Sequence, residues 1–433
     1  MVIDVSLEEE IAMSQSFVST ELSSRRSFLQ TAGAVLGAGM MPFASASSRA
    51  SRKKSVAAIV TIYQRNSHTD VLIGKILEGW EHDGGPGPDL ELASMYVDQF
   101  PEKDLSRGMA AKFGFPICDS IEQAITLGQD RVAVDGVISV GEHGDYPWND
   151  MGQHLYPRRR FFEEITNTLE KHDQIVPVFN DKHPGPVWDD AKWMYDRAQE
   201  LNIPFMAGSS LPVSYRKPDF ELPMHSDLEA SMAIGYSGLD VYGFHTLDYL
   251  QSIIERRQCE DQGVEWVQCL PGLKIRELIE AGVIRRDLLT KILEVTPTND
   301  TDLLSANPKQ FDVMLVQYRD GLLVPVLMLP GYSQAISAVV KVRGQQPIGG
   351  IAEERPEPRY PHFANLLKGI EQMIHTGVPA YPVERTILTA GMLDRLLTSR
   401  SQDGKKLMTP ELAINYKAVD YPHAPHIDLL KSF

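Results

Sequence analysis

Apolar residues in the first half of the chain gather in short runs that alternate with amphipathic stretches. The runs are rich in Val and Ile and predict buried strands at 55–63, 90–97, 134–140, 175–179 and 204–207. Between them, apolar residues recur at helical spacing and predict helices at 69–80, 104–113, 120–127, 159–171 and 186–201. Strands separated by helices of this length need right-handed crossovers, so this half is predicted to form a doubly wound, Rossmann-like parallel sheet.

The second half has a different pattern, in which strands follow one another directly. Strands are predicted at 311–318, 322–329 and 334–342, and Arg319-Asp320-Gly321 predicts a tight hairpin between the first two. Predicted helices at 245–257, 361–376 and 383–400 flank this sheet. The predicted fold class is therefore α/β: a Rossmann-like domain followed by an α+β domain with a mostly antiparallel, open sheet.

The N-terminal segment reads as an export signal. Residues 24–30, Ser-Arg-Arg-Ser-Phe-Leu-Gln, resemble the twin-arginine motif, and a weakly apolar run at 31–43 leads to Ala44-Ser45-Ala46, a small-residue cleavage pattern. The run is too short and Gly-rich to span a bilayer. An amphipathic helix is the alternative, and Met13 is a second candidate start. We expect export to the periplasm or the outside of the cell.

These patterns divide the chain into five predicted segments. They are a signal peptide (1–46), a linker (47–54), the Rossmann-like domain (55–210), the α+β domain (211–412) and a C-terminal tail (413–433).

The charge and the cysteine content of the chain limit which partners it can bind and whether disulfides stabilise its fold. The 433 residues contain 42 Lys and Arg against 58 Asp and Glu, a formal net charge of −16. An acidic chain without a basic block is a poor nucleic-acid binder. Three cysteines are too few for a disulfide scaffold. Cys259 and Cys269 either form one bridge or, like Cys118, are free buried thiols.

Short motifs then point to one family. Five short segments occur in the following order: 110–114 (Ala-Ala-Lys-Phe-Gly), 119–120 (Asp-Ser), 134–137 (Val-Asp-Gly-Val), 180–184 (Asn-Asp-Lys-His-Pro) and 243–248 (Gly-Phe-His-Thr-Leu-Asp). They resemble motifs of the glucose–fructose oxidoreductase, inositol dehydrogenase and rhizopine-catabolism family over about 55–412. The resemblance implies NAD(P)-dependent hydride transfer on a sugar or polyol. It also implies a second domain with an open-faced sheet, and a homo-oligomer.

One segment departs from the family. Its first strand is followed by Gly-x-Gly-x-x-Gly, where glycines let the backbone approach the dinucleotide's pyrophosphate. Here residues 63–69 contain no glycine. Either Gln64 and Asn66 donate to a phosphate in a changed pose, or the cofactor site is lost. Asp98, at the end of the second strand, is either a ribose ligand or a solvated strand end.

The loop after the third strand is the next candidate. The resemblance puts Glu142 and His143 beside the nicotinamide. Further along, Asp145, Tyr146 and Trp148 combine a carboxylate with aromatic rings at the carboxyl end of a parallel strand, where open α/β sheets bind ligands. Such a loop suits a sugar; the alternative is a long surface loop.

Lys182 and His245 are the predicted catalytic pair. The resemblance implies that both face the nicotinamide and move the hydroxyl proton, and Asp248, one helical turn after His245, could orient or charge the imidazole. The alternatives are a surface lysine and a packed histidine. The family's Asp four residues before the His is Val241 here, with Asp240 one residue further back.

A metal site is a further, minor hypothesis, because histidine and carboxylate side chains can bind zinc or manganese. The candidate ligands are not spaced as a metal motif would be: they are His143, Asp145, His183, His225 and His245.

Three functions therefore compete. They are an exported oxidoreductase with a nicotinamide, a cofactor-free or metal-dependent lyase or hydrolase, and a non-catalytic carbohydrate-binding protein. In the first two, Lys182, His245 and the loop 142–148 are predicted to line one cleft.

Overall fold

The computed structural model describes residues 52–257, 263–299, 302–306 and 308–426. The predicted signal peptide and Cys259 lie outside the described residues. The chain divides after Lys53, and Lys54 begins the second of its two units. The second unit contains every helix and strand named below.

The first sheet has six parallel strands in the order β3-β2-β1-β4-β5-β6. They are β1 (Lys54–Val60), β2 (Leu90–Val97), β3 (Ile117–Cys118), β4 (Gly136–Val140), β5 (Val178–Asp181) and β6 (Phe205–Gly208). The connecting helices are α2 (His68–Glu78), α3 (Ser106–Phe113), α4 (Ile121–Thr126), α5 (Arg158–Lys171) and α6 (Trp188–Glu200). This is the doubly wound order, so the predicted Rossmann-like sheet is confirmed. The two-residue β3 was too short for its pattern to be recognised.

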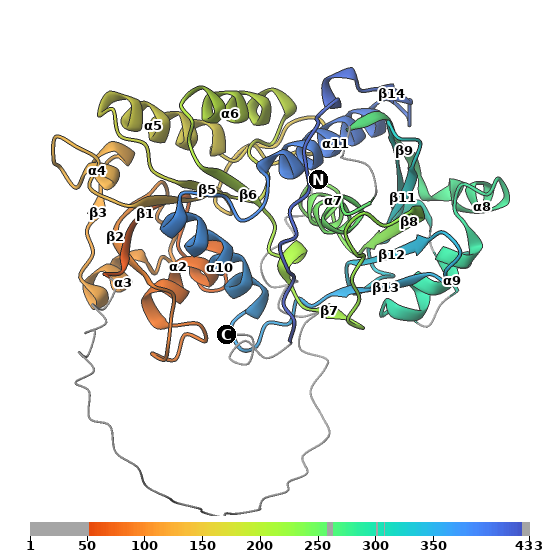
Figure 1. Ribbon diagram of the computed structural model, residues 1–433, viewed down its shortest axis with the longest axis horizontal. Helices are drawn as coiled ribbons and strands as arrows, with labels where there is room; N and C mark the ends of the chain where they lie inside the picture. Colours follow the sequence, from red (N-terminus) through yellow and green to blue (C-terminus); the bar gives the residue numbers. More distant parts are fainter. Residues whose placement is uncertain (1–51, 258–262, 300–301, 307, 427–433) are drawn as a thin grey trace, which may run out of the picture. The chain divides into compact units, whose positions relative to one another are not determined.

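Both faces of this sheet are covered by helices (Figure 1). Ala57 and Ile59 of β1 face α4, α5 and α6, while Val56, Ala58 and Val60 face α2 and α10 (Pro361–Thr376). The sequence placed α10 beside the second sheet, and this placement is wrong. Its apolar stripe completes the cover that the short α2 leaves over β1 and β4.

The second sheet has eight strands in the order β14-β9-β10-β11-β8-β12-β13-β7. They are β7 (Arg216–Lys217), β8 (Leu228–Gly235), β9 (Val264–Pro271), β10 (Asp312–Tyr318), β11 (Leu323–Met328), β12 (Ser337–Val342), β13 (Ile348–Ala352) and β14 (Leu407–Met408). Every pairing is antiparallel except β11 with β8, which confirms the predicted mixed fold. The predicted hairpin is also present, because Gln317 pairs with Leu323 and Gly321 has φ 94°.

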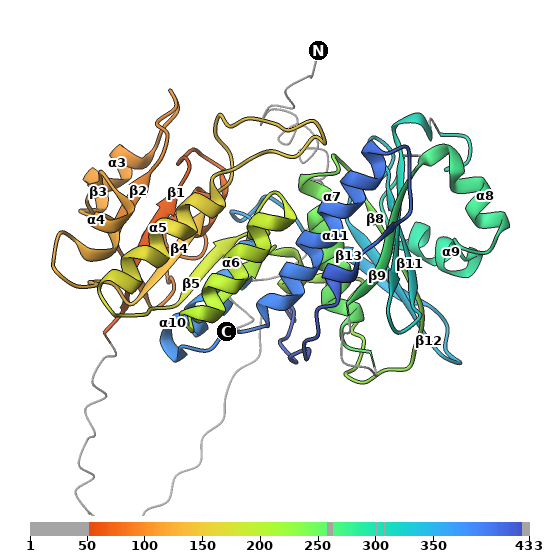
Figure 2. The same cartoon turned by 90° about the horizontal axis from the view of Figure 1, so that it is seen from above.

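Helices lie on both sides of the second sheet (Figure 2). One face, with Ala233 and Met314, packs on α7 (Val241–Ile254) and α11 (Val383–Ser401). The opposite face, with Met232 and Val313, packs on α8 (Ile275–Glu280) and α9 (Arg286–Val295). The open face implied by the resemblance is therefore partly covered by the chain itself.

Four short 3₁₀ helices complete the described elements: η1 (Leu211–Val213), η2 (Gly272–Lys274), η3 (Pro308–Gln310) and η4 (Pro410–Leu412). Cys118 and Cys269 are buried free thiols. Within the described residues, no helix is long and apolar enough to cross a membrane.

Candidate functional site

A buried ion-pair network lies where β4 and β5 end. Lys182 Nζ donates to Glu142 Oε1 at 2.7 Å, and Arg158 Nη2 donates to Glu142 Oε2 at 2.5 Å. The three side chains are at most 3% exposed. Parallel strands end at the same edge of a sheet, so the topology brings the predicted Glu142 and Lys182 together.

The network holds Glu142 as a carboxylate. Burial by itself would raise the pKa of Glu142, but the positive charges of Lys182 and Arg158 override it, so the pKa lies well below its ordinary value. A buried carboxylate with two cationic partners is satisfied only while both remain. Arg158 was not recognised from the sequence, because nothing distinguishes an arginine at the start of a helix.

The backbone at Lys182 is in the left-handed region, with φ 61°. Few residues other than glycine adopt this conformation, and such outliers occur often at functional sites. Lys182 N donates to Gly208 O at 3.1 Å, which ties the end of β5 to the end of β6. The bend directs the Lys182 side chain to Glu142 at the end of β4.

His245 joins this edge through β6. Its Nδ1 lies 2.5 Å from Ser209 Oγ, and Ser209 directly follows β6. Asp248 Oδ2 accepts a hydrogen bond from Ser209 N at 2.9 Å. Within the described residues Asp248 makes no hydrogen bond to His245, so it acts on the imidazole through Ser209 and not by the predicted direct contact. Ser209 itself was missed, although a polar residue at a strand end is the signal that found Lys182.

The surroundings make His245 a neutral imidazole. Burial lowers its pKa well below the ordinary value, and the charge of Lys182 lowers it further. Ser209 Oγ forms a hydrogen bond with His245 Nδ1, and no hydrogen bond to His245 Nε2 occurs in the described part of the chain. Lys182 thus brings an ammonium donor and His245 an uncharged base to one edge. A hydrogen-bond donor and an uncharged base at one edge are groups that acid–base catalysis can use.

The loop between β1 and α2 does not fit a dinucleotide in the usual Rossmann pose. Tyr63, where the loop would need a glycine, is fully buried, and Asn66 takes the left-handed turn with φ 64°. Asp70, in the first turn of α2, accepts from Asn66 N at 2.8 Å and forms an ion pair with Arg359. A carboxylate already occupies the helix N-terminus, where the pyrophosphate's negative charge would have to lie.

Other groups fill the same corner. Arg359 Nη1 donates to Asn66 Oδ1 at 2.9 Å. His68, the first residue of α2, contacts Asp181 Oδ2 at 2.6 Å, and its ring lies 4.8 Å from that of Phe363 at the start of α10. Gln64 forms hydrogen bonds with Ser67 in its own turn, and none to another segment among the described residues. Asn66 is thus engaged by the protein itself.

Asp98, the predicted ribose ligand, is engaged as well. Tyr96 and Tyr146 donate their hydroxyls to it at 2.8 and 2.7 Å, and Arg160 pairs with it at 2.6 Å. Burial opposes ionisation of Asp98, but these three donors override it and lower its pKa. To bind Asp98, a ribose would have to displace the guanidinium of Arg160 and the hydroxyls of Tyr96 and Tyr146.

The residues predicted to bind substrate in the loop 143–148 make contacts with other parts of the protein or are exposed. His143 has φ 65°, and its ring lies 5.4 Å from that of His68. Asp145 is exposed, and Tyr146 is held by Asp98. Trp148 is 55% exposed and stacks on His154, with ring centroids 4.2 Å apart. Of this loop, Glu142 is the residue that forms an ion pair with Lys182.

No three metal-binding side chains of the described residues gather as a metal site would need.

Comparisons with known proteins identify the fold. No family model matches the sequence, and no curated protein matches it either. Solved structures do match. GenD2 from gentamicin A biosynthesis, crystallised with NAD, has a TM-score of 0.54 at 10% identity, over 82% of this chain and 96% of its own. The scyllo-inositol dehydrogenase from Lactobacillus casei, with NAD(H) and scyllo-inositol bound, has a TM-score of 0.50 at 10% identity, over 82% and 99%. The chain therefore has the fold of the inositol dehydrogenase family.

Proposed function

We propose that the chain is an enzyme that moves protons on a hydroxylated carbonyl or carboxyl compound, such as a keto-polyol or sugar acid. The observation that carries this proposal is the pairing of the Lys182 ammonium with Glu142 beside a neutral His245. The fold supports a sugar or polyol substrate, because the scyllo-inositol dehydrogenase of this fold was crystallised with scyllo-inositol.

The chemistry we propose is redox-neutral. The carboxylate of Asp70 and the engaged Asp98 oppose a dinucleotide in the Rossmann pose, so no hydride acceptor is assigned. Proton transfer needs none. His245 Nε2 takes a proton from the carbon beside the carbonyl, and the electron pair becomes an enolate whose oxygen receives a hydrogen bond from Lys182. Return of a solvent-exchanged proton from the protonated His245 to that carbon gives hydrogen exchange. Transfer of the proton from His245 to a hydroxyl on the neighbouring carbon, with cleavage of that C–O bond, releases water and completes an elimination.

The test is hydrogen exchange with solvent. Keto-inositols and uronates are incubated with the protein in D₂O, and deuterium at carbon is followed by NMR. We expect exchange by the wild type and its loss, about 100-fold or more, in His245→Asn, which can keep a hydrogen bond to Ser209. A folded His245→Asn variant that exchanges as fast as the wild type contradicts the proposal. Binding without exchange by the wild type favours a non-catalytic carbohydrate-binding protein.

We also propose that residues 1–46 direct export by the twin-arginine pathway, on the sequence pattern alone. Replacing Arg25 and Arg26 together by Lys should keep the precursor inside the cell. Equal amounts of processed protein outside the cytoplasm in both forms would contradict this.

A further inference from the structure

A second imidazole is held at the carboxyl edge of the parallel sheet. His68 begins α2, and its Nδ1 lies 2.6 Å from Oδ2 of Asp181, the last residue of β5. This contact carries the ring from the start of α2 to the end of β5. The side chain of Asp181 is 1% exposed and that of His68 is 14% exposed. The proton transfer assigned to His245 uses neither residue, so it does not explain this contact.

His68 and His245 are anchored in the same way. Asp181 directly precedes Lys182, and Ser209 follows the β6 residue that accepts the hydrogen bond from Lys182 N. Asp181 holds Nδ1 of His68. At the end of the neighbouring strand, Ser209 holds Nδ1 of His245. In the described part of the chain no hydrogen bond reaches Nε2 of either ring, which leaves this nitrogen of both rings for proton transfer.

The two rings come from helices of different apolar clusters. The helix α2 packs on the face of the parallel sheet formed by Val56 and Ala58, whereas α7 belongs to the cluster that includes the opposite face. Burial and the charge of Lys182 lower the pKa of His245, and the charge of His68 lowers it further. The two imidazoles therefore reach one site from different sides.

The two anchors differ in charge. Ser209 is neutral, so it adds no charge beside His245. The carboxyl group of Asp181 can orient His68 and stabilise its imidazolium, as an aspartate does for the histidine of a hydrolase triad. His68 is therefore suited to give a proton, and His245 is suited to take one.

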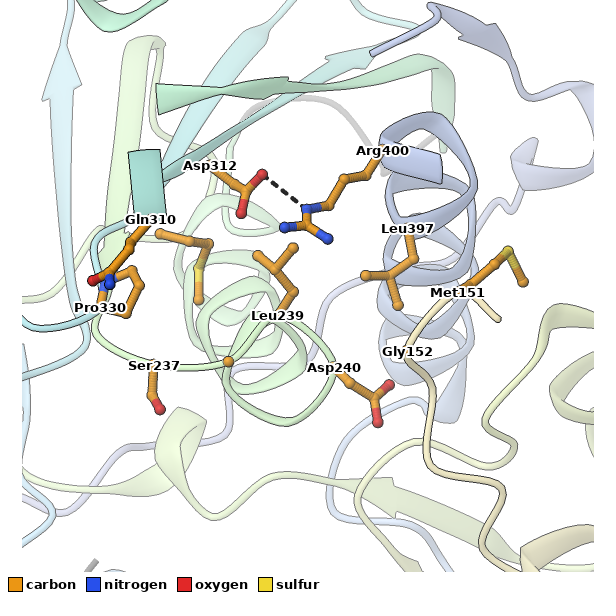
Figure 3. A pocket seen from close by; sticks show the side chains of 12 residues that line it. Met151, Gly152, Ser237, Leu239, Asp240, Gln310, Asp312, Pro330, Leu397 and Arg400 are labelled. Atoms are coloured by element: carbon orange, nitrogen blue, oxygen red, sulfur yellow. Dashed lines mark hydrogen bonds and ion pairs between the residues drawn. The ribbon is translucent and has the colours of Figure 1, made fainter. Parts of the chain in front are cut away.

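The cavity beside the start of α7 is a separate feature. It has a volume of about 250 Å³, and its walls include Asp240 and Arg400 (Figure 3). None of His68, Lys182 and His245 lines it. The two imidazoles therefore mark a different place in the fold.

We propose that His68 and His245 are the two acid–base groups of an epimerisation, with Asp181 as a positioning residue for His68. His245 Nε2 takes the proton from the carbon beside the carbonyl, and the C–H electron pair forms the enolate whose oxygen receives a hydrogen bond from Lys182. The His68 imidazolium gives a proton to the same carbon from the opposite face, so the carbonyl re-forms and the carbon is inverted. Water then returns a proton to His68 and removes one from His245. This inference rests on the proposed function and adds its stereochemical outcome.

Two signals from one NMR experiment test the inference. Keto-inositols and uronates are incubated with the protein in D₂O, and the deuterated substrate and the inverted epimer are measured separately. We expect the wild type to form the epimer with deuterium at the inverted carbon. In His68→Gln the ratio of epimer to deuterated substrate should fall about 100-fold or more, because His245 returns deuterium only to the face that it deprotonates. Asp181→Asn keeps an oxygen for Nδ1 and removes the charge, so it should lower this ratio about tenfold or more.

His423→Gln is the matched control, because it removes another imidazole that contacts an aspartate, Asp219 at 2.9 Å. It should leave the ratio unchanged. Deuterium exchange without any epimer in the wild type overturns the inference, as does a wild-type ratio in His68→Gln, and the proposed function survives both results. Loss of both signals in folded His68→Gln also overturns it, because His68 would then only support the His245 centre. Absence of exchange in the wild type contradicts the proposed function and this inference alike.

Discussion

Two regions at the carboxyl edge of the parallel sheet differ in what their charged side chains contact. One is the corner between β1 and α2, and the other is the corner where β4, β5 and β6 end. At the β1–α2 corner, Asp70 and Asp98 are paired with Arg359 and Arg160, and the protein fills the space that a dinucleotide takes in this fold. At the β4–β6 corner, Lys182 and Glu142 are also paired, but within the described residues no hydrogen bond reaches His245 Nε2. The same sheet edge thus carries a closed corner and one that retains a reactive group.

The comparison teaches that one edge of a sheet can carry two ion-pair networks with different surroundings: Asp70 and Arg359 fill the β1–α2 corner, whereas Lys182 and Glu142 lie near His245 at the other. The charged side chains of the two corners differ in burial, because Arg160 is 44% exposed whereas Lys182 and Glu142 are each 3% exposed. Within the described residues the β1–α2 corner also leaves buried polar atoms without a hydrogen bond, such as Tyr63 Oη and Arg359 Nε, so what sets the β4–β6 corner apart is the His245 imidazole held by Ser209 near the Lys182–Glu142 ion pair. Substitutions should therefore affect stability in both corners and turnover in only one.

The largest effect is expected for Lys182→Met. It leaves Glu142 buried with Arg158 alone, and breaking a buried pair costs about 3–5 kcal/mol. Urea unfolding measures this loss. Lys182→Met combined with Glu142→Gln should recover part of the stability and none of the solvent exchange. Solvent exchange by the double variant at the wild-type rate would mean that the Lys182–Glu142 pair stabilises the fold and takes no part in the reaction.

Arg359→Gln breaks the ion pair of the other corner and should cost about 2–4 kcal/mol, since Asp70 is 5% exposed and loses its cationic partner. Solvent exchange per folded molecule should stay within about twofold of the wild type. A large loss of exchange at unchanged stability would mean that the closed corner takes part in the reaction.

Gly141→Ala tests how tightly the reactive corner is packed. A Cβ at Gly141 would lie 2.6 Å from Cγ of Arg158, which would have to move away from Glu142. We expect a loss of about 1–3 kcal/mol in thermal or urea unfolding. Gly108→Ala in α3, where a Cβ meets nothing within 4 Å, is the control and should stabilise by up to about 1 kcal/mol.

The last effect concerns pH. Burial lowers the pKa of His183 and His245 well below its ordinary value and that of His362 to about 3. Below about pH 6.5 the unfolded chain binds protons at these positions and the folded chain does not. Stability should therefore fall with decreasing pH, by about 1.4 kcal/mol per unit for each histidine. His362→Phe should flatten the slope between pH 6 and 4 by that amount; an unchanged slope would place a charged imidazole in the fold.

The sequence was sufficient for local and topological features. Alternating runs predicted the parallel sheet, and polar residues at strand ends predicted that Glu142 and Lys182 would meet. Contacts between distant segments were not predictable. Arg359 and Asp70 are 289 positions apart in the sequence. The sequence of an amphipathic helix such as α10 shows that one face is buried but not which sheet it packs on. Asp240 was noted only as displaced from a family position, because the lack of a hydrogen bond to its buried Oδ1 within the described residues is a property of packing.

The central claim is that this fold operates without a dinucleotide in its Rossmann corner, and measuring dinucleotide content and affinity tests it most directly. Purified protein is denatured and its extract analysed by mass spectrometry, and intact protein is titrated with NADH and NADPH by fluorescence. We predict no stoichiometric nicotinamide in the extract and no saturable binding below about 1 mM, a level at which binding amounts to only about 4 kcal/mol. One tightly held NAD(P) per chain, lost on denaturation and retained in Lys182→Met, would contradict the claim.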